Sequence, residues 1–298
     1  MSITAGMVAE LREKTGLGMM DCKKALTEAG GDMALAIENL RKKGAATAAK
    51  RSGKATKEGK VVSVCDGKFS AIFEINCETE PVAKVDNFVN LTQDVKKAVI
   101  ENKPANLDAL LAVKIGSQTI QEITVDLIGK IGEKIIVSSY YPQTAQGNEQ
   151  IFSYVHSNGK VGALIKLSSD KDLGENADFK QLGNDIAMQA AAQKPLAIDK
   201  AGVSQELVAK EKEIYIEQIK NDPKNSSKPQ EVLSKIADGK LVKFFKESTL
   251  LDQEFIKNDK ISIQQLIDET GKKLSAKLGV CQMDVVELGA NSVEEEEE

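Results

Sequence analysis

Hydrophobic residues in the first fifty positions recur at helical spacing, and glycines follow the periodic stretches. In AGMVAELREKTG, Val8 and Leu11 share one face, and Gly16 ends the pattern. The stretches MMDCKKALTEAGG and DMALAIENLRKKG come next, and Asp32 caps the second of them while Gly44 ends it. The pattern predicts three short helices that form a compact N-terminal domain.

The segment that follows, AATAAKRSGKATKEGK, carries no apolar stripe and consists largely of alanine, lysine and glycine. Such a composition is typical of a solvated linker between domains. We therefore place the three-helix domain at residues 1–52 and the linker at residues 53–59.

Beyond the linker, four segments recur in the same order further along the chain. They are GKFSAIFEI and GKVGALIKL (from Gly67 and Gly159), NFVNLTQDV and DFKQLGNDI (from Asn87 and Asp178), Lys103-Pro104 and Lys194-Pro195, and IQEITVDLIGKIGEKIIV and IQQLIDETGKKLSAKLGV (from Ile120 and Ile263). The first three pairs lie 91 or 92 positions apart, and the fourth pair lies 143 positions apart. This register predicts two copies of one unit, each of which reads strand, helix, helix, strand.

The longer spacing of the fourth pair means that the second copy carries an insertion. Two charge-rich helical stretches, SQELVAKEKEIYIEQIKND and QEVLSKIADGKLVKFFKES, flank the turn-forming PKNSSKP. They predict an antiparallel helical hairpin that projects from the body. Its expected apolar positions are Leu207, Ile214, Val232, Ile236 and Phe244.

The predicted fold class is α+β. We expect core subdomain 1 at residues 60–145 and core subdomain 2 at residues 146–288, with the hairpin insertion at about 196–251. The terminal GANSVEEEEE cannot pack, because five glutamates repel one another, and we expect an acidic disordered tail at 289–298.

Composition narrows the possible functions. The net charge of −5 argues against direct nucleic-acid binding, which needs a basic surface. No apolar run reaches the ~18 residues that a membrane-spanning helix requires, and the N-terminus lacks the layout of a secretory signal, so we expect a cytoplasmic protein. Four cysteines without a CxxC pair are expected to be ordinary buried thiols: Cys22, Cys65, Cys77 and Cys281.

Motifs for catalysis or cofactor binding are scarce. His156 is the single histidine, so one chain cannot build a histidine metal cluster or a triad that contains histidine. Neither a GxxxxGK[ST] loop nor a GxGxxG after a strand occurs, and we expect no bound nucleotide or other cofactor.

The stretch INCETEPVAK ends a predicted buried strand with two carboxylates and a proline. Glu78 and Glu80 could form a general acid/base pair, although residues at i and i+2 of an extended segment point to opposite sides. They could equally be two solvated carboxylates at a strand end. The residues alone leave both interpretations open.

The stretch INCETEPVAK, taken together with LREKTGLGMMDCKKAL and IGEKIIV, also resembles the elongation factor Ts family, the bacterial guanine-nucleotide exchange factors of elongation factor Tu. The resemblance extends to about Leu288. It implies a ubiquitin-associated-like three-helix domain, a core of two related subdomains and a helical hairpin inserted in the second. The implied partner is elongation factor Tu, in its GDP-bound and nucleotide-free forms, and the implied activity is release of GDP without covalent catalysis.

The resemblance also implies a role for the strand end. In the family, the stretch that matches Thr79 to Lys84 reads Thr-Asp-Phe-Val-Ala followed by Lys or Arg, and its tip wedges beside the magnesium site of Tu. Here Glu80 stands in place of Asp, and Pro81 stands in place of Phe. We expect an extended tip that the proline pre-organises. Because the aromatic anchor is missing, a Tu-binding or chaperone-like paralog that exchanges no nucleotide stays an alternative.

The partner-binding residues implied by the resemblance come from four parts of the chain. They are Arg12, Met19, Met20, Thr79, Glu80, Pro81, Val82, Ile131, Gly132 and His156. For the methionine pair the alternative is a role at a helix end, and for His156 it is an ordinary turn residue. Phe88 and its repeat partner Phe179 are expected to be core residues.

Overall fold

The computed structural model describes residues 3–222 and 228–292 and divides into two units. The first unit comprises residues 1–66, 71–142 and 286–298, and the second comprises residues 67–70 and 143–285. The predictions for most of the turn PKNSSKP and for the five terminal glutamates fall outside the described residues.

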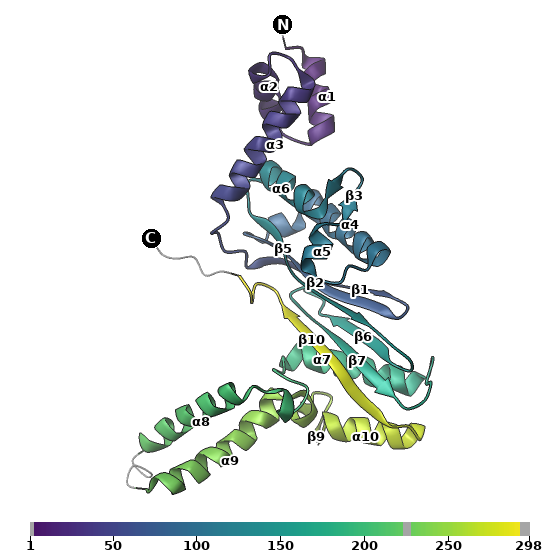
Figure 1. Ribbon diagram of the computed structural model, residues 1–298, viewed down its shortest axis with the longest axis vertical. Coiled ribbons are helices and arrows are strands. Elements are labelled where there is room, and N and C mark those ends of the chain that lie inside the picture. The colour runs from purple at the N-terminus through teal and green to yellow at the C-terminus, as the bar shows by residue number, and fades with distance from the viewer. Residues whose placement is uncertain (1–2, 223–227, 293–298) are drawn as a thin grey trace. The chain divides into compact units, whose positions relative to one another are not determined.

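Three helices form the N-terminal part of the first unit (Figure 1): α1 (Ala5–Thr15), α2 (Met19–Glu28) and α3 (Met33–Lys50). The side chain of Thr4 caps α1, Gly16 ends it in the left-handed conformation, and Asp32 caps α3. The helices bury one small apolar core between them. Its fully buried members are Leu11, Cys22, Leu26 and Ala36.

Helix α3 does not end at Gly44, as the sequence pattern predicts, but continues to Lys50. Gly44 is buried against Gly129 of helix α6 (Ile120–Ile131), and a Cβ atom on Gly129 would lie 2.7 Å from the Gly44 Cα atom. The glycine therefore serves close helix packing instead of a helix end, and the alanine-rich stretch after it is a good helix former.

The first copy of the repeat is a three-stranded sheet covered by helices. Its strands are β1 (Glu58–Asp66), β2 (Phe69–Cys77) and β5 (Ile135–Thr144), in the order β1-β2-β5. Between β2 and β5 come η1 (Val82–Lys84), α4 (Asp86–Asn102), α5 (Leu107–Leu111), the short pair β3 (Lys114–Ile115) and β4 (Gln118–Thr119), and α6. Every residue of β2 is buried, because it is the central strand.

The second copy has the same strand order. Strands β6 (Gln150–Val155), β7 (Val161–Ser169) and β10 (Leu278–Glu287) form a sheet in which β7 is central. The helices of this copy are α7 (Ala177–Gln193) and α10 (Ile263–Leu274). Between them lie η2 (Lys200–Gly202), α8 (Gln205–Lys220), α9 (Gln230–Ser248), η3 (Leu250–Asp252), β8 (Glu254–Phe255) and β9 (Asn258–Ser262).

The two main helices of one copy have the same lengths as their counterparts in the other copy. Helices α4 and α7 have 17 residues each, and α6 and α10 have 12 each. Both α4 and α7 end on a lysine in the left-handed conformation, Lys103 and Lys194, each with φ of 46°. The counterparts Phe88 and Phe179 are both fully buried, so their predicted core role is confirmed.

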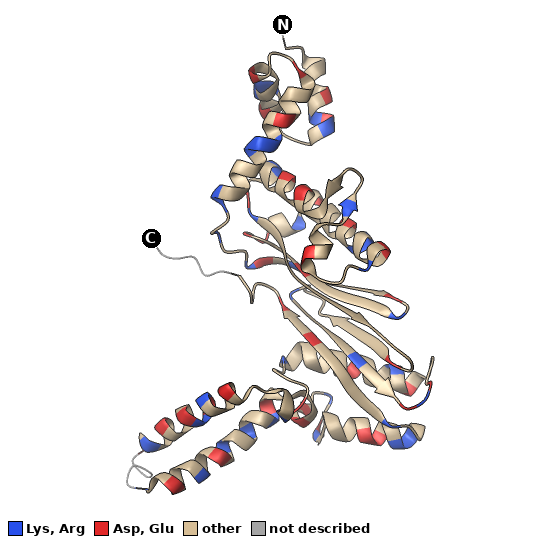
Figure 2. Ribbon diagram, viewed as in Figure 1, with Lys and Arg blue, Asp and Glu red and all other residues tan. Residues whose placement is uncertain are grey.

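Helices α8 and α9 pack against each other as an antiparallel pair, and charged residues of both signs alternate along them (Figure 2). Their own core consists of Ile219, Leu233 and Ala237. Two of the apolar positions named from the sequence, Ile214 and Val232, are 38% and 39% exposed. Charge-rich helices have a weak hydrophobic stripe, so some of their apolar side chains stay at the surface.

The two ends of the insertion lie side by side. Leu196 donates its backbone N–H to the carbonyl oxygen of Ser248 at 2.8 Å, and Leu250 donates to the carbonyl oxygen of Ala197 at 2.9 Å. Ala197 and Thr249 also form a parallel bridge.

Deletion of residues 203–247, closed by a short glycine linker, is expected to leave the second unit folded, because these backbone bonds already hold the ends together. The midpoint of thermal unfolding should shift by a few degrees at most, as followed by circular dichroism. Loss of a cooperative transition in the deletion variant would show that the hairpin belongs to the core.

Candidate partner-binding site

The segment after strand β2 is a tight turn. Thr79 accepts the backbone N–H of Val82 on its carbonyl oxygen at 3.2 Å, and Pro81 accepts the N–H of Lys84 at 3.1 Å. Pro81 has φ −57° and ψ −37° and leads into the short helix η1. The expected extended tip is therefore wrong: the proline ring fixes φ at a helical value, and its missing N–H is not needed at a helix start.

Glu80 and Pro81 are exposed on this turn, whereas Val82 is buried. The Glu80 carboxylate lies 2.8 Å from Nζ of Lys84, and its side chain is 58% exposed. The hydrogen bond to Glu80 raises the pKa of Lys84 above its ordinary value. Exposed pairs of this kind contribute little to stability, so Glu80 can exchange Lys84 for another cation at small cost.

Glu78 has a different environment from Glu80. Nη1 of Arg51 donates to both of its carboxylate oxygens at 3.0 and 2.7 Å, and the backbone N–H of Lys134 donates to Oε1 at 2.5 Å. The Glu78 side chain is 14% exposed, so it is not a solvated carboxylate. Glu78 and Glu80 thus each have a cationic partner of their own, Arg51 and Lys84.

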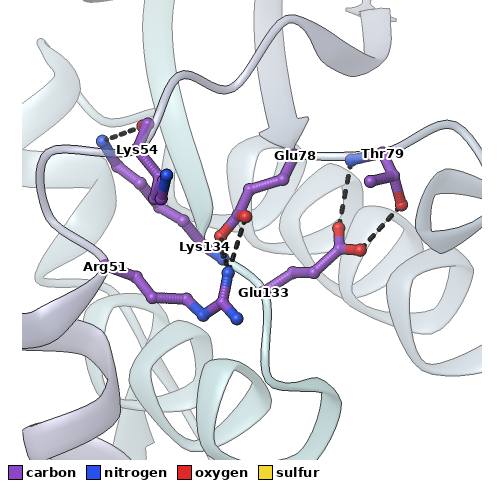
Figure 3. Close-up of polar contacts among 6 residues, drawn as sticks. All are labelled: Arg51, Lys54, Glu78, Thr79, Glu133 and Lys134. Carbon is purple, nitrogen blue, oxygen red and sulfur yellow. Dashed lines mark hydrogen bonds and ion pairs between the residues drawn. The ribbon is translucent and has the colours of Figure 1, made fainter. Parts of the chain in front are cut away.

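Glu133 holds Thr79 with both of its carboxylate oxygens (Figure 3). Oε2 accepts the Thr79 backbone N–H at 3.0 Å, and Oε1 accepts the Thr79 hydroxyl at 2.7 Å. Sequence reasoning missed Glu133, Arg51 and Lys134. For Glu133 a signal existed, because it directly follows the Ile131-Gly132 pair, whose family counterpart lies beside the wedge.

The Thr79–Glu133 bonds bring the Ile131-Gly132 pair next to the turn. Gly132 ends α6 in the left-handed conformation, with φ of 83°, and a Cβ atom there would meet nothing within 4 Å. Its counterpart Ser275 is also left-handed, with φ of 51°. The fold thus requires this conformation in both copies, and glycine at position 132 leaves open space beside the turn.

The remaining predicted contact residues lie elsewhere. Arg12 on α1 is exposed, and Met19 and Met20 at the start of α2 are 61% and 76% exposed. Both methionines therefore face solvent, where a flexible thioether suits an adaptable contact surface. His156 belongs to the second unit, where it is exposed and its Nδ1 lies 2.9 Å from the Tyr154 hydroxyl.

Two of the four cysteines are not buried, contrary to expectation. Cys22 and Cys77 are buried, whereas Cys65 and Cys281 are exposed. Cys77 ends strand β2 and donates its thiol to the carbonyl oxygen of Thr79 at 3.2 Å. Burial, together with the charges of Glu133 and Glu58, raises the pKa of Cys77 to about 12.

Of the four thiols, only Cys65 and Cys281 are therefore expected to react with Ellman's reagent in the native protein at pH 8. At this pH about one Cys77 side chain in 10⁴ is a thiolate, and the thiolate is the reactive form. The native protein should release two equivalents of thionitrobenzoate, and the unfolded chain four. The native Cys65→Ser/Cys281→Ser variant should release none. Fast release of one equivalent from this variant would show that Cys22 or Cys77 is accessible.

The arrangement is one of recognition. A buried strand delivers an exposed carboxylate on a turn that ion pairs and hydrogen bonds hold in place, next to open space above Gly132. Among the residues that the structure describes, no group of three or more His, Cys, Asp and Glu side chains could hold a metal ion. Within the same residues, no helix has the length and apolar character to span a membrane. An ordered turn with an exposed carboxylate is a surface suited to contact with another molecule.

Comparison with known proteins identifies the family of this chain. The family model described as "Elongation factor TS" matches residues 78–290. The elongation factor Ts of Cytophaga hutchinsonii is 45% identical over 92% of this chain and 96% of its own length. Those of an Azoarcus species and a Nitratiruptor species are 43% and 40% identical, over 92% and 100% of this chain and 88% and 97% of their own lengths.

The chain belongs to the elongation factor Ts family, the guanine-nucleotide exchange factors of translation elongation. The relatives at this level of identity favour exchange over the alternative of a non-exchanging paralog.

Proposed function

We propose that this chain binds elongation factor Tu in its GDP-bound form and promotes the release of GDP. The turn of residues 79–82 enters beside the magnesium and phosphate site of the partner. An exchange factor must bind the nucleotide-free partner more tightly than the GDP-bound partner, by the same free energy by which it weakens GDP binding. Disturbing the magnesium ligands is an effective route, because magnesium demands near-ideal octahedral geometry.

The observation that carries this proposal is the exposed Glu80 carboxylate on a turn that the rest of the unit holds in place. A negative group brought close to magnesium-bound phosphates competes with them for the cation. Because the turn is already ordered, little conformational entropy is lost when it inserts. Pro81 contributes a rigid apolar surface at the place where the family has an aromatic side chain.

Further contacts extend the proposed interface. Arg12, Met19 and Met20 meet the nucleotide domain of Tu through the three-helix part, which we take to be ubiquitin-associated-like. Ile131 and Gly132 meet it beside the turn, and His156 meets another Tu domain. The complex forms in the cytoplasm and involves neither a cofactor of this chain nor direct contact with nucleic acid or membrane.

The test is a stopped-flow measurement of fluorescent GDP leaving elongation factor Tu from the same organism. Excess unlabelled GDP prevents rebinding, and the concentration of this chain is varied. The release rate should rise with concentration to a plateau far above the spontaneous rate. A chain that binds Tu in a pull-down but leaves the release rate unchanged would be a non-exchanging paralog and would refute the proposal.

A further inference from the structure

The two copies of the repeat offer an internal comparison for the turn after β2. Glu78 corresponds to Asp170, and Lys134 corresponds to Lys277. In the second copy, Asp170 accepts the backbone N–H of Lys277 at 2.9 Å, as Glu78 accepts that of Lys134 at 2.5 Å. A carboxylate that closes the end of the central strand onto the start of the last strand is therefore a property of the repeated fold.

The second copy lacks the residues for the bonds to Thr79. The counterparts of Thr79 and Glu133 are Lys171 and Ala276, and an alanine side chain has no acceptor. Lys171 instead donates its Nζ to the carbonyl oxygen of Leu274 at 2.6 Å. Since the second copy folds with alanine at this position, the repeated fold does not require the Glu133 carboxylate.

The first copy adds a second set of bonds, from the segment that joins α3 to β1. Arg51 donates twice to Glu78, and Nζ of Lys134 donates to the carbonyl oxygen of Lys54 at 2.9 Å (Figure 3). The same Nζ also donates to the carbonyl oxygen of Ser52 at 2.6 Å. Glu78, before the turn, is therefore bonded to Arg51 at the end of α3. Thr79, in the turn, is bonded to Glu133 just after the end of α6.

We propose that Glu133, supported by the Arg51–Glu78 pair, is a positioning residue that orders the turn of residues 79–81 before the partner arrives. The inference rests on the proposed function, because the ordered turn is the part that acts on the GDP site. Without Glu133, Thr79 loses two acceptors at once, and the turn samples conformations in which Glu80 points elsewhere. Part of the binding free energy then goes into ordering the turn instead of displacing the nucleotide.

The test compares Glu133→Ala with a matched control in the same unit. Glu122 also accepts the backbone N–H and the hydroxyl of a threonine, Thr119, at 2.8 and 3.2 Å, but there the bonds cap helix α6. Glu122→Ala thus removes the same type of bonds from the opposite end of that helix.

Two quantities are measured for both variants. Hydrogen exchange of the Thr79 amide in the free protein should become at least tenfold faster in Glu133→Ala and stay unchanged in Glu122→Ala. The plateau rate of GDP release should fall about fivefold in Glu133→Ala, with little change in the half-saturating concentration, and stay unchanged in Glu122→Ala. Glu133→Gln keeps one carbonyl oxygen for the Thr79 amide and should restore part of the plateau.

A double variant distinguishes positioning from general destabilisation. Thr79→Val removes the hydroxyl but keeps the branched shape, so Thr79→Val/Glu133→Ala should release GDP no more slowly than Glu133→Ala alone. Unchanged hydrogen exchange, or an unchanged plateau, in Glu133→Ala would overturn the positioning role while leaving an active wild-type chain as an exchange factor. An inactive wild-type chain would overturn the proposed function itself, and with it any role of Glu133 in exchange.

Discussion

Glu80→Ala is expected to slow the release of GDP from elongation factor Tu by about tenfold at saturating concentration, which corresponds to about 1.4 kcal/mol. Its carboxylate is exposed and pairs with the exposed Lys84, a type of contact that adds little to stability, so its loss leaves the fold intact. Binding to nucleotide-free Tu should weaken less than release slows, because Glu80 acts on the bound ion and phosphates. Stopped-flow fluorescence measures release, and calorimetry measures binding.

Glu101→Ala is the matched control for this variant. The Glu101 side chain is also 58% exposed and also has a lysine partner one helical turn away, Lys97. It lies at the end of α4, outside the turn. Equal release rates for Glu80→Ala and the wild type would mean that the turn is only the end of a strand.

Pro81→Phe indicates how the missing aromatic side chain is compensated. On a Tu with the usual aromatic pocket, the variant should strengthen exchange, because a buried aromatic residue of an interface can contribute about 2 kcal/mol. On a cognate Tu whose pocket has become smaller, the same change should weaken exchange through overpacking. Parallel release assays with the cognate Tu and with one from a relative that has phenylalanine distinguish the two cases.

The second large effect concerns the packing of helix α7 on strand β6. A Cβ atom on Gly183 would lie 2.3 Å from ring atoms of Phe152, which also packs edge-on against Phe179 with ring centroids 5.7 Å apart. Gly183→Ala should therefore lower the free energy of unfolding by about 1–3 kcal/mol, although alanine is the better helix former. Chemical denaturation followed by circular dichroism gives the value.

Gly239→Ala in helix α9 is expected to change stability in the opposite direction. Nothing lies within 4 Å of a Cβ atom at this position. The substitution should leave the body unaffected and stabilise the hairpin by about 0.5–1 kcal/mol through helix propensity alone. If Gly183→Ala stabilised the protein as Gly239→Ala is expected to do, the close contact between Gly183 and Phe152 would not exist in solution.

Local and repeated features of the fold could be predicted from the sequence. Helix signals such as Asp32 at the start of α3 and Gly16 at the end of α1 depend on neighbouring residues, and the structure confirms both. Segments that resemble each other predict equal elements because the same side chains fill the same places. The prediction for Gly44 was wrong, since this glycine packs against Gly129, far away in the sequence, and no local pattern reveals such a contact.

The candidate site shows the same limit. The exposure of Glu80, Pro81, Met19 and Met20 agrees with a surface role, and the resemblance indicated these positions. The two bonds of Thr79 to Glu133 could not be predicted, because the two residues lie 54 positions apart in the chain. The sequence left the role of Glu78 open, because its partner Arg51 lies 27 positions away.

The bonded ends of the insertion have a consequence for protein engineering. Since Leu196 meets Ser248 and Ala197 meets Leu250 through the backbone, whatever joins these ends adds little loop-closure entropy to the second unit. The same junction could accept a fluorescent reporter or an affinity module in place of α8 and α9. It could also serve as the break point of a circular permutant, with new termini next to each other.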